Sequence, residues 1–263
     1  MPIPTNNKKH DWYSIDNKET STDIFIYDVV GWETTAKDFV RELRTIKNEI
    51  NLHLNTPGGD VFDGNSIYNE LKSHPSKVNV YIDGLAASIG SIIAMSGDTI
   101  NIAKNGFMMI HNPFTMAMGN AEEIRKTANM LDKVRDSLVQ TYIDKTGQSK
   151  EQIVDWMDQE TWFDSNEALA AGFATNIVED KEIEDVADLR IYNHVPKEVQ
   201  DLYQVSNVNN EEVNRRNVER TLRDAGYSRK VAREIVKSGI KDSDSQRDAD
   251  VQKIIDRIDN IKI

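Results

Sequence analysis

Short apolar runs alternate with amphipathic stretches along the first part of the chain. The runs lie at residues 23–31, 50–55 and 78–82. Their length and their Ile, Val and Leu content are typical of buried strands. Between them, residues 34–46 and 63–73 carry apolar side chains at helical spacing, and Pro75 ends the second of these stretches. With a third helix after the third strand, the pattern predicts a largely parallel sheet covered by helices.

The pattern continues with two further strands and a long helix. Residues 99–103 and 106–113 are predicted strands, and residues 120–146 carry apolar side chains at helical spacing up to Gly147. A helix of this length is about 40 Å long, more than a small domain needs, so we expect it to project and pack against another subunit. The alternative is an ordinary long surface helix. A helix beginning at the cap Ser149, a short helix at 166–172 and a strand at 173–178 complete this part.

The composition changes near residue 180. Residues 179–188 are mostly acidic, and residues 206–263 are rich in charge and contain a single aromatic residue, Tyr227. Helical patches are expected at 213–225, 228–237 and 251–261. They carry too little apolar surface for a core of their own and are expected to order on a partner. We therefore predict a polar N-terminal lead (1–22), one α/β domain (23–180) and a charged, partly helical C-terminal extension (181–263).

The composition of the chain excludes several classes of function and several kinds of site. The chain of 263 residues has a net charge of −12 and no cysteine. The charge argues against nucleic-acid binding, and the missing cysteines exclude disulfides, thiolate metal sites and a cysteine nucleophile. We expect no metal and no cofactor. Residues 1–10 have no apolar signal core, and no apolar run approaches the length of a membrane span, so a cytoplasmic protein without membrane contact is expected.

The candidate chemistry centres on residues 84–95. Here Ser88 stands among glycine, alanine and aliphatic residues where a strand turns into a helix. Small neighbours let a substrate backbone approach the hydroxyl, and the first turn of the helix offers unpaired N–H groups to a developing negative charge. The alternative is a buried helix in which small residues merely allow tight packing. Ser91 is the competing serine, and packing or capping suits it better.

Three further features suit a serine nucleophile. His111 ends an apolar strand, residues 155–164 include several carboxylates, and residues 56–59 form a turn with exposed backbone N–H groups. A serine needs an imidazole to remove its proton, the imidazole needs a carboxylate to orient it, and the oxyanion needs preorganised donors. The remaining histidines fit other roles. His53 suits a core or edge position, whereas His10, His74 and His194 lie in polar or turn contexts.

Four short blocks carry a resemblance to a known family. Residues 55–59, 84–91, 109–113 and 160–163 resemble, in order and at similar spacing, the signature blocks of the ClpP serine protease family. Residues 112–121 resemble in particular the ClpP-like proteases that phages and prophages use in head maturation. The resemblance covers residues 23–178 approximately. It implies a serine endopeptidase that processes capsid or scaffold proteins during prohead maturation.

The resemblance assigns roles to single residues. It implies that Ser88 is the nucleophile, that His111 is the general base and later the acid, and that the N–H groups of Gly59 and Ile89 form the oxyanion hole. Cellular members of the family have an aspartate where this chain has Glu160. Glutamate can orient an imidazole with one more methylene, so Glu160 is the expected third member. Asp164 and Asp158 remain open as alternatives.

The resemblance also implies an architecture. It predicts the crotonase-like spiral of ββα units with a projecting helical handle at 120–146, and homo-oligomeric rings, two stacked heptamers, that enclose the active sites. Substrates would be proteins or peptides, selected by access to the chamber. An unfoldase ATPase partner is not expected, because residues 1–19 do not resemble the axial loop of the family.

Three other functions fit part of the pattern. A non-catalytic oligomeric scaffold could use the same core and recruit capsid subunits through its tail, but it has no use for Ser88 and His111. A crotonase acting on CoA thioesters shares the fold but lacks this Ser-His spacing. An α/β-hydrolase requires glycine where Ala86 stands and an acid before its histidine.

Overall fold

The computed structural model describes residues 12–31, 35–181, 189 and 191–200, the backbone of residues 8, 9, 201 and 202, and the single residues 222 and 233. The chain forms two compact units. One consists of residues 1–113 and 130–205, and the other of residues 114–129 and 206–263. The helices predicted at 213–225, 228–237 and 251–261 lie outside the described residues, apart from single helical positions at 222 and 233.

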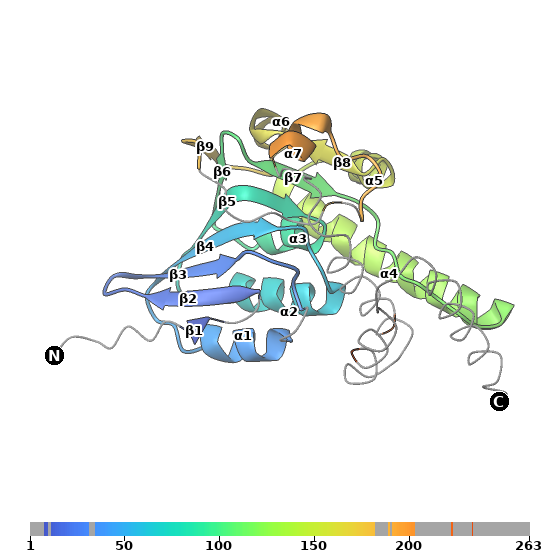
Figure 1. The fold of residues 1–263 in the computed structure, drawn as a ribbon, viewed down its shortest axis with the longest axis horizontal. Helices are drawn as coiled ribbons and strands as arrows, with labels where there is room; N and C mark the ends of the chain where they lie inside the picture. Colours follow the sequence, from blue (N-terminus) through green and yellow to red (C-terminus); the bar gives the residue numbers. More distant parts are fainter. Residues whose placement is uncertain are drawn as a thin grey trace, which may run out of the picture. The chain divides into compact units, whose positions relative to one another are not determined.

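A mixed sheet forms the centre of the first unit (Figure 1). Its neighbouring strands are, in order, β1 (Lys8–Lys9), β2 (Tyr13–Asn17), β3 (Ser21–Ile26), β4 (Glu49–Thr56), β5 (Val78–Ala87), β6 (Thr99–Ala103) and β9 (Asn176–Val178). From β3 to β9 each neighbouring pair is parallel, which confirms the predicted parallel sheet. β2 lies antiparallel to β3 and was not predicted, although Trp12, Tyr13 and Ile15 are buried there.

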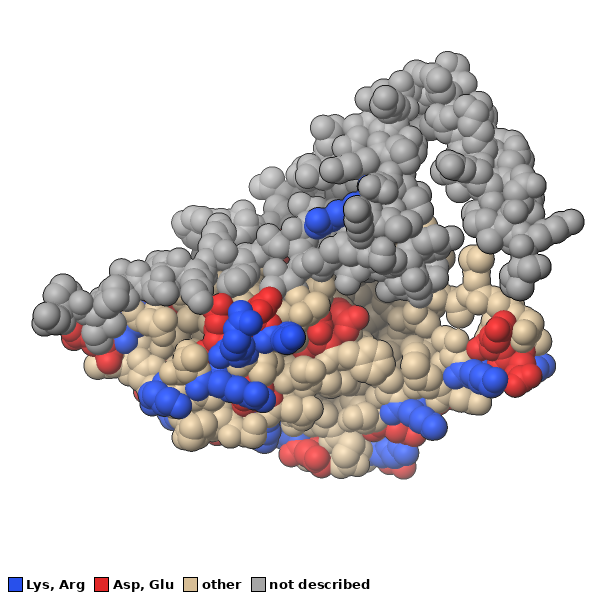
Figure 2. Space-filling view, turned by 90° about the horizontal axis from the view of Figure 1, so that it is seen from below, with Lys and Arg blue, Asp and Glu red and all other residues tan. Residues whose placement is uncertain are grey.

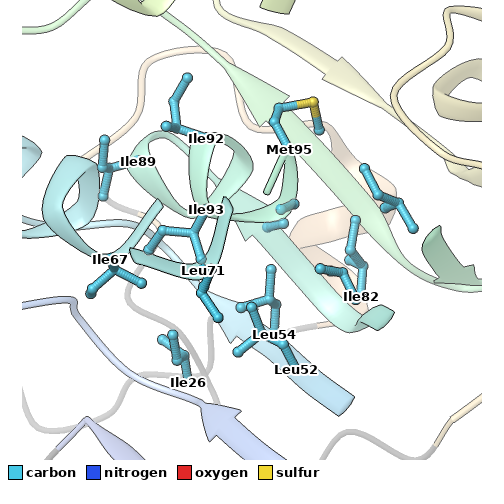
Figure 3. Close-up of a cluster of buried hydrophobic side chains, with 14 of the residues drawn as sticks. Ile26, Leu52, Leu54, Ile67, Leu71, Ile82, Ile89, Ile92, Ile93 and Met95 are labelled. Carbon is cyan, nitrogen blue, oxygen red and sulfur yellow. The ribbon is translucent and has the colours of Figure 1, made fainter. Parts of the chain in front are cut away.

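Three helices pack beside one another on this sheet (Figure 1). They are α1 (Ala36–Leu43), α2 (Val61–Lys72) and α3 (Ile89–Ala94). Figure 3 shows the shared core: strand residues Ile26, Leu52, Leu54 and Ile82 beside helix residues Ile67, Leu71, Ile89, Ile92 and Ile93. Removing these aliphatic side chains from water is the main force that holds the helices on the sheet.

β5 is longer than the sequence pattern predicted. We expected it to end at Asp83-Gly84, but it continues to Ala87 because its second half finds a new partner. That partner is β7 (Phe107–Ile110), which pairs with β5 in parallel and in turn pairs antiparallel with β8 (Thr161–Phe163). The three-residue β8 was not predicted, since a strand this short has no readable alternation. β5, β7 and β8 together carry the candidate site.

In the described part of the chain, four helices with assigned bounds follow β7. They are α4 (Ala121–Thr146), α5 (Lys150–Asp158), α6 (Ser165–Ala170) and α7 (Lys197–Leu202). α4 matches the prediction to within one residue, and its buried side chains, Leu138, Val139 and Tyr142, all lie in its second half. On the face seen in Figure 2, basic and acidic side chains of the described residues stand beside one another. No helix in the described part of the chain is both long and apolar enough to cross a bilayer.

Part of the chain beyond residue 180 contacts the core of the first unit. Leu189, Tyr192 and Val199 are buried and form a cluster with residues of β5 and β7. The sequence predicted only a marginal tail here. The domain boundaries at residues 22 and 180 themselves remain predictions.

Candidate active site

Ser88 lies between β5 and α3 with a left-handed backbone, at φ 54°. This conformation is uncommon for a residue with a side chain, and it persists only where neighbouring contacts enforce it. Here the Ser88 N–H donates to the Met109 carbonyl oxygen at 2.9 Å, and the Ser88 carbonyl accepts from the Ser91 N–H at 3.0 Å. The two bonds hold a sharp turn at the end of a strand, on a residue that is partly exposed.

His111 lies at hydrogen-bond distance from this hydroxyl. Its Nε2 is 2.8 Å from Ser88 Oγ. The register of β5 and β7 explains the approach, because Ala87 pairs with Met109, two residues before His111. Burial lowers the pKa of His111 below its ordinary value of 6.5, and the charge of Glu160 opposes this by a smaller amount. The imidazole is therefore neutral at neutral pH and can accept a proton.

The register between β7 and β8 explains the position of Glu160. Ile110 pairs with Thr161 across the antiparallel β7 and β8, so one step further places Glu160 opposite His111. Glu160 is buried and has a left-handed backbone, at φ 52°. Its Oε1 accepts the backbone N–H groups of Asn193 and His194, at 2.9 and 2.7 Å. These donors fix the position of the carboxylate.

The two alternative acids have other partners. Asp158 accepts hydrogen bonds from Arg135 Nη2 at 2.6 Å and from Asn112 Nδ2 at 2.8 Å. Asp164 caps α6, accepting the N–H of Glu167 at 2.8 Å in a reciprocal capping box. Of the three acids predicted from the sequence, Glu160 is the one whose charge acts on the pKa of His111.

The loop that carries Gly58 and Gly59, directly before α2, lies against Val30. The Val30 N–H donates to the Gly58 carbonyl at 2.7 Å, and the Val30 carbonyl accepts the Asp60 N–H at 3.0 Å. This is a parallel bridge between Val30 and Gly59. In such a bridge the intervening residue directs its own N–H to the opposite side. The Gly59 N–H therefore points away from Val30, on an exposed residue.

Gly58 of this loop lies close to Ser88. A Cβ built on Gly58 would stand 2.8 Å from Ser88 Cβ and 3.3 Å from the Ile89 backbone nitrogen. The loop thus approaches the first N–H of α3 so closely that only glycine fits. The Gly58 backbone therefore lies close to both the Ser88 side chain and the Ile89 backbone nitrogen.

Ser91 lies in the core. It is fully buried, its Oγ donates to the Ser88 carbonyl at 2.6 Å, and it lies 2.7 Å from Tyr142 Oη. This agrees with the packing and capping role that we expected.

Among the other histidines that the structure describes, His53 and His74 contact other residues, and His194 contributes its backbone N–H to Glu160. His53 Nδ1 lies 2.8 Å from Asp83 Oδ2, on a carboxylate that also accepts Lys181 Nζ at 2.6 Å. His74 Nδ1 accepts the Ser76 N–H. His10 lies outside the described side chains.

Sequence reasoning missed Tyr192. Its ring meets the His111 ring edge to face at a centroid distance of 5.4 Å. Its hydroxyl donates to the Pro57 carbonyl oxygen, directly before the glycine loop. The available signal was a small group of apolar residues at 189–199 within a polar stretch, which indicates a segment that packs onto something. What it packs onto could not be read from the pattern.

The described residues contain no group of three or more His, Cys, Asp or Glu side chains arranged to hold a metal ion. The side chains assembled around Ser88 are those of general-base and nucleophilic chemistry.

Comparison with known proteins identifies relatives of the chain. Residues 7–181 match the family described as Clp protease. The chain is 30% identical over 154 residues to the ATP-dependent Clp protease proteolytic subunit 2 of Tropheryma whipplei (strain Twist), covering 58% of this chain and 86% of the relative. It is 33% identical over 135 residues to the ATP-dependent Clp protease proteolytic subunit 3 of Rhodococcus jostii (strain RHA1), covering 50% of this chain and 66% of the relative.

Proposed function

Because the chain belongs to the Clp protease family and is a serine protease of that type, we propose that Ser88, His111 and Glu160 are its catalytic triad. The contact between His111 Nε2 and Ser88 Oγ at 2.8 Å carries this proposal. The buried carboxylate of Glu160, which acts on the pKa of His111, supports it.

In the acylation step, Ser88 Oγ attacks the carbonyl carbon of the scissile peptide bond while His111 Nε2 accepts the hydroxyl proton. The negative charge that forms on the carbonyl oxygen is stabilised by the N–H groups of Gly59 and Ile89. Glu160 stabilises the imidazolium. When the C–N bond breaks, His111 gives its proton to the leaving amine, and the acyl chain stays on Ser88.

In the second step, water replaces the amine. His111 removes a proton from the water, the hydroxide attacks the acyl carbon, and the same oxyanion donors act again. The ester bond to Ser88 breaks and the proton returns to Oγ. The enzyme is then regenerated and the new carboxyl end is released.

Labelling with a fluorophosphonate tests the nucleophile. The parent should label at a single serine, and Ser88→Ala should remove both labelling and peptide cleavage. Ser91→Ala is the matched control, since Ser91 is a buried packing residue three positions away; it should label even if its stability falls by about 1–2 kcal/mol. Labelling of Ser88→Ala would contradict the assignment.

We infer further that the natural substrates are capsid or scaffold chains of a phage or prophage. The likeness of residues 112–121 to head-maturation proteases supports this. The test is incubation of the purified protein, and of Ser88→Ala, with capsid and scaffold chains from the same genome. Defined fragments formed by the parent alone are expected, without an ATPase. Cleavage that requires an added unfoldase would overturn the proposed independence from ATP.

We also propose two stacked heptameric rings, with α4 at the contact between subunits. Members of this family are oligomeric proteases that act on protein substrates. Met130 of α4 is 42% exposed, so an apolar side chain is available for a contact there.

A further inference from the structure

We propose that residues 192–194 are positioning residues that hold the triad and the oxyanion loop in register. This inference rests on the catalytic roles proposed above. The segment touches three parts of the site: Tyr192 contacts His111 and Pro57, and the N–H groups of Asn193 and His194 bind Glu160.

The hydrogen bonds from residues 193 and 194 restrict the side chain of Glu160, which is one methylene longer than aspartate. Glutamate has one more rotatable bond than the aspartate of cellular relatives, so its carboxylate has more ways to turn away from an imidazole. Two backbone donors, at 2.9 and 2.7 Å, remove this freedom. Bonds from N–H to carboxylate are among the stronger hydrogen bonds, and a backbone donor cannot rotate away as a side chain can. The segment therefore turns a flexible acid into a fixed one.

Tyr192 contacts both the proposed base, His111, and the loop that carries Gly58 and Gly59. Its ring lies edge to face on His111 at 5.4 Å and on Trp162 at 5.7 Å, with interplanar angles of 84° and 80°. Aromatic neighbours on a ring restrict its rotation. The Tyr192 hydroxyl at the same time donates to the Pro57 carbonyl. One side chain thus fixes the distance between the base and the loop that carries Gly59.

The segment is anchored on the strands that carry the triad. Leu189 and Val199, on either side of it, are buried against Leu85, Ala87 and Met109 of β5 and β7. Ser88 nevertheless remains partly exposed and Gly59 exposed. The segment supports the site from the side of His111 and Glu160 and leaves the nucleophile open, which fits positioning and not blockage.

The test uses full-length variants, with labelling rate, kcat, KM, pH profile and assembly size measured for each. Asn193→Pro removes one N–H donor to Glu160. We expect kcat to fall about tenfold or more with little change in KM. Because a looser Glu160 raises the pKa of His111 less, the acidic limb of kcat/KM should also move to lower pH. Asn193→Ala keeps this N–H and loses only the side-chain amide contact at 3.5 Å, so its loss should be smaller.

Two more variants test the Tyr192–Pro57 bond and the contacts of Glu160 one at a time. Tyr192→Phe keeps the ring on His111 and loses the bond to Pro57, so kcat should fall without a shift of the pH profile. Glu160→Asp shortens the side chain by one methylene, so we expect its carboxylate to lose contact either with the Asn193 and His194 donors or with His111, and kcat to fall. If Asn193→Pro does not assemble, Glu160→Asp and Tyr192→Phe decide the question.

Parental kcat and pH profile in Glu160→Asp and Tyr192→Phe would overturn the positioning role, as would a rise in activity in any of these variants. Such results would leave the loss of activity in Ser88→Ala intact. A failure of the proposed function would differ, because Ser88→Ala would then behave like the parent.

Discussion

At the scale of single residues, two side chains of the site stand on left-handed backbone. Ser88 and Glu160 have φ values of 54° and 52°, and they are the non-glycine residues with positive φ in the described part of the chain. Such conformations cost about 1–3 kcal/mol each and occur where surrounding contacts over-determine the backbone. Both residues belong to the proposed triad. The strain directs Ser88 Oγ toward His111 and brings the Glu160 carboxylate under the Asn193 and His194 donors.

The lowered pKa of His111 predicts the pH dependence of cleavage. The base must be neutral, so kcat/KM falls as pH drops through the pKa of His111, which lies below 6.5 because burial outweighs the charge of Glu160. Glu160→Gln removes the charge that raises this pKa. The acidic limb should therefore move further down while kcat falls. A limb above pH 6.5 in the parent, or a limb that rises in Glu160→Gln, would contradict this account.

Gly58 offers a second prediction at this scale. Alanine at this position has φ +99° and a Cβ 2.8 Å from Ser88 Cβ, so it must displace the loop or the nucleophile. We expect Gly58→Ala to lose about 100-fold in kcat/KM. Gly147→Ala is the control, with φ +71° and open space around the new Cβ. It should cost about 1 kcal/mol of stability and leave cleavage unchanged. Equal activity losses would mean that backbone strain alone is responsible.

At the scale of elements, the registers of β5, β7 and β8 assemble the site. The parallel pairing of Ala87 with Met109 brings His111 to Ser88, and the antiparallel pairing of Ile110 with Thr161 brings Glu160 to His111. A shift of one residue in either pairing would turn the functional side chain to the other face of the sheet. The catalytic geometry therefore depends on two short ladders.

Asp164, which caps α6, is expected to have a structural role, in contrast to the proposed catalytic role of Glu160. Asp164 accepts the N–H groups of Asn166 and Glu167, both at 2.8 Å. Asp164→Ala should lower the free energy of unfolding by about 1 kcal/mol, as measured by urea denaturation, with little change in kcat. Glu160→Ala should show the reverse order, with the larger effect on kcat. A large loss of kcat in Asp164→Ala at unchanged assembly would reinstate Asp164 as the acid.

At the scale of the whole molecule, α4 carries the prediction about assembly. Its buried residues lie in its second half, whereas Met130 is exposed. If α4 packs against another subunit, Met130→Glu places a charge in an apolar contact and should reduce the assembly to smaller species in light scattering. Asn129→Glu, an exposed neighbour that points in another direction on the helix, should keep the size of the parent. A parental size for Met130→Glu would exclude this part of α4 from the contact.

The sequence by itself determined the alternation of strands and helices and the parallel sheet. These features depend on apolar periodicity and on pairings between neighbouring elements, both of which leave local patterns in the chain. The pattern did not predict the early strand β2 and the three-residue β8. One lies in a polar stretch, and the other is too short to show a period.

Only the tertiary structure favours Glu160 over Asp158 and Asp164 as the proposed acid, because all three lie within one short stretch and the register of β7 and β8 places just one of them opposite His111. It also brought Tyr192 and the N–H groups of Asn193 and His194 to the site. A backbone N–H is the same in every residue but proline, so no sequence pattern marks the ones that bind a carboxylate. Their role follows from where the chain folds back over β5 and β7.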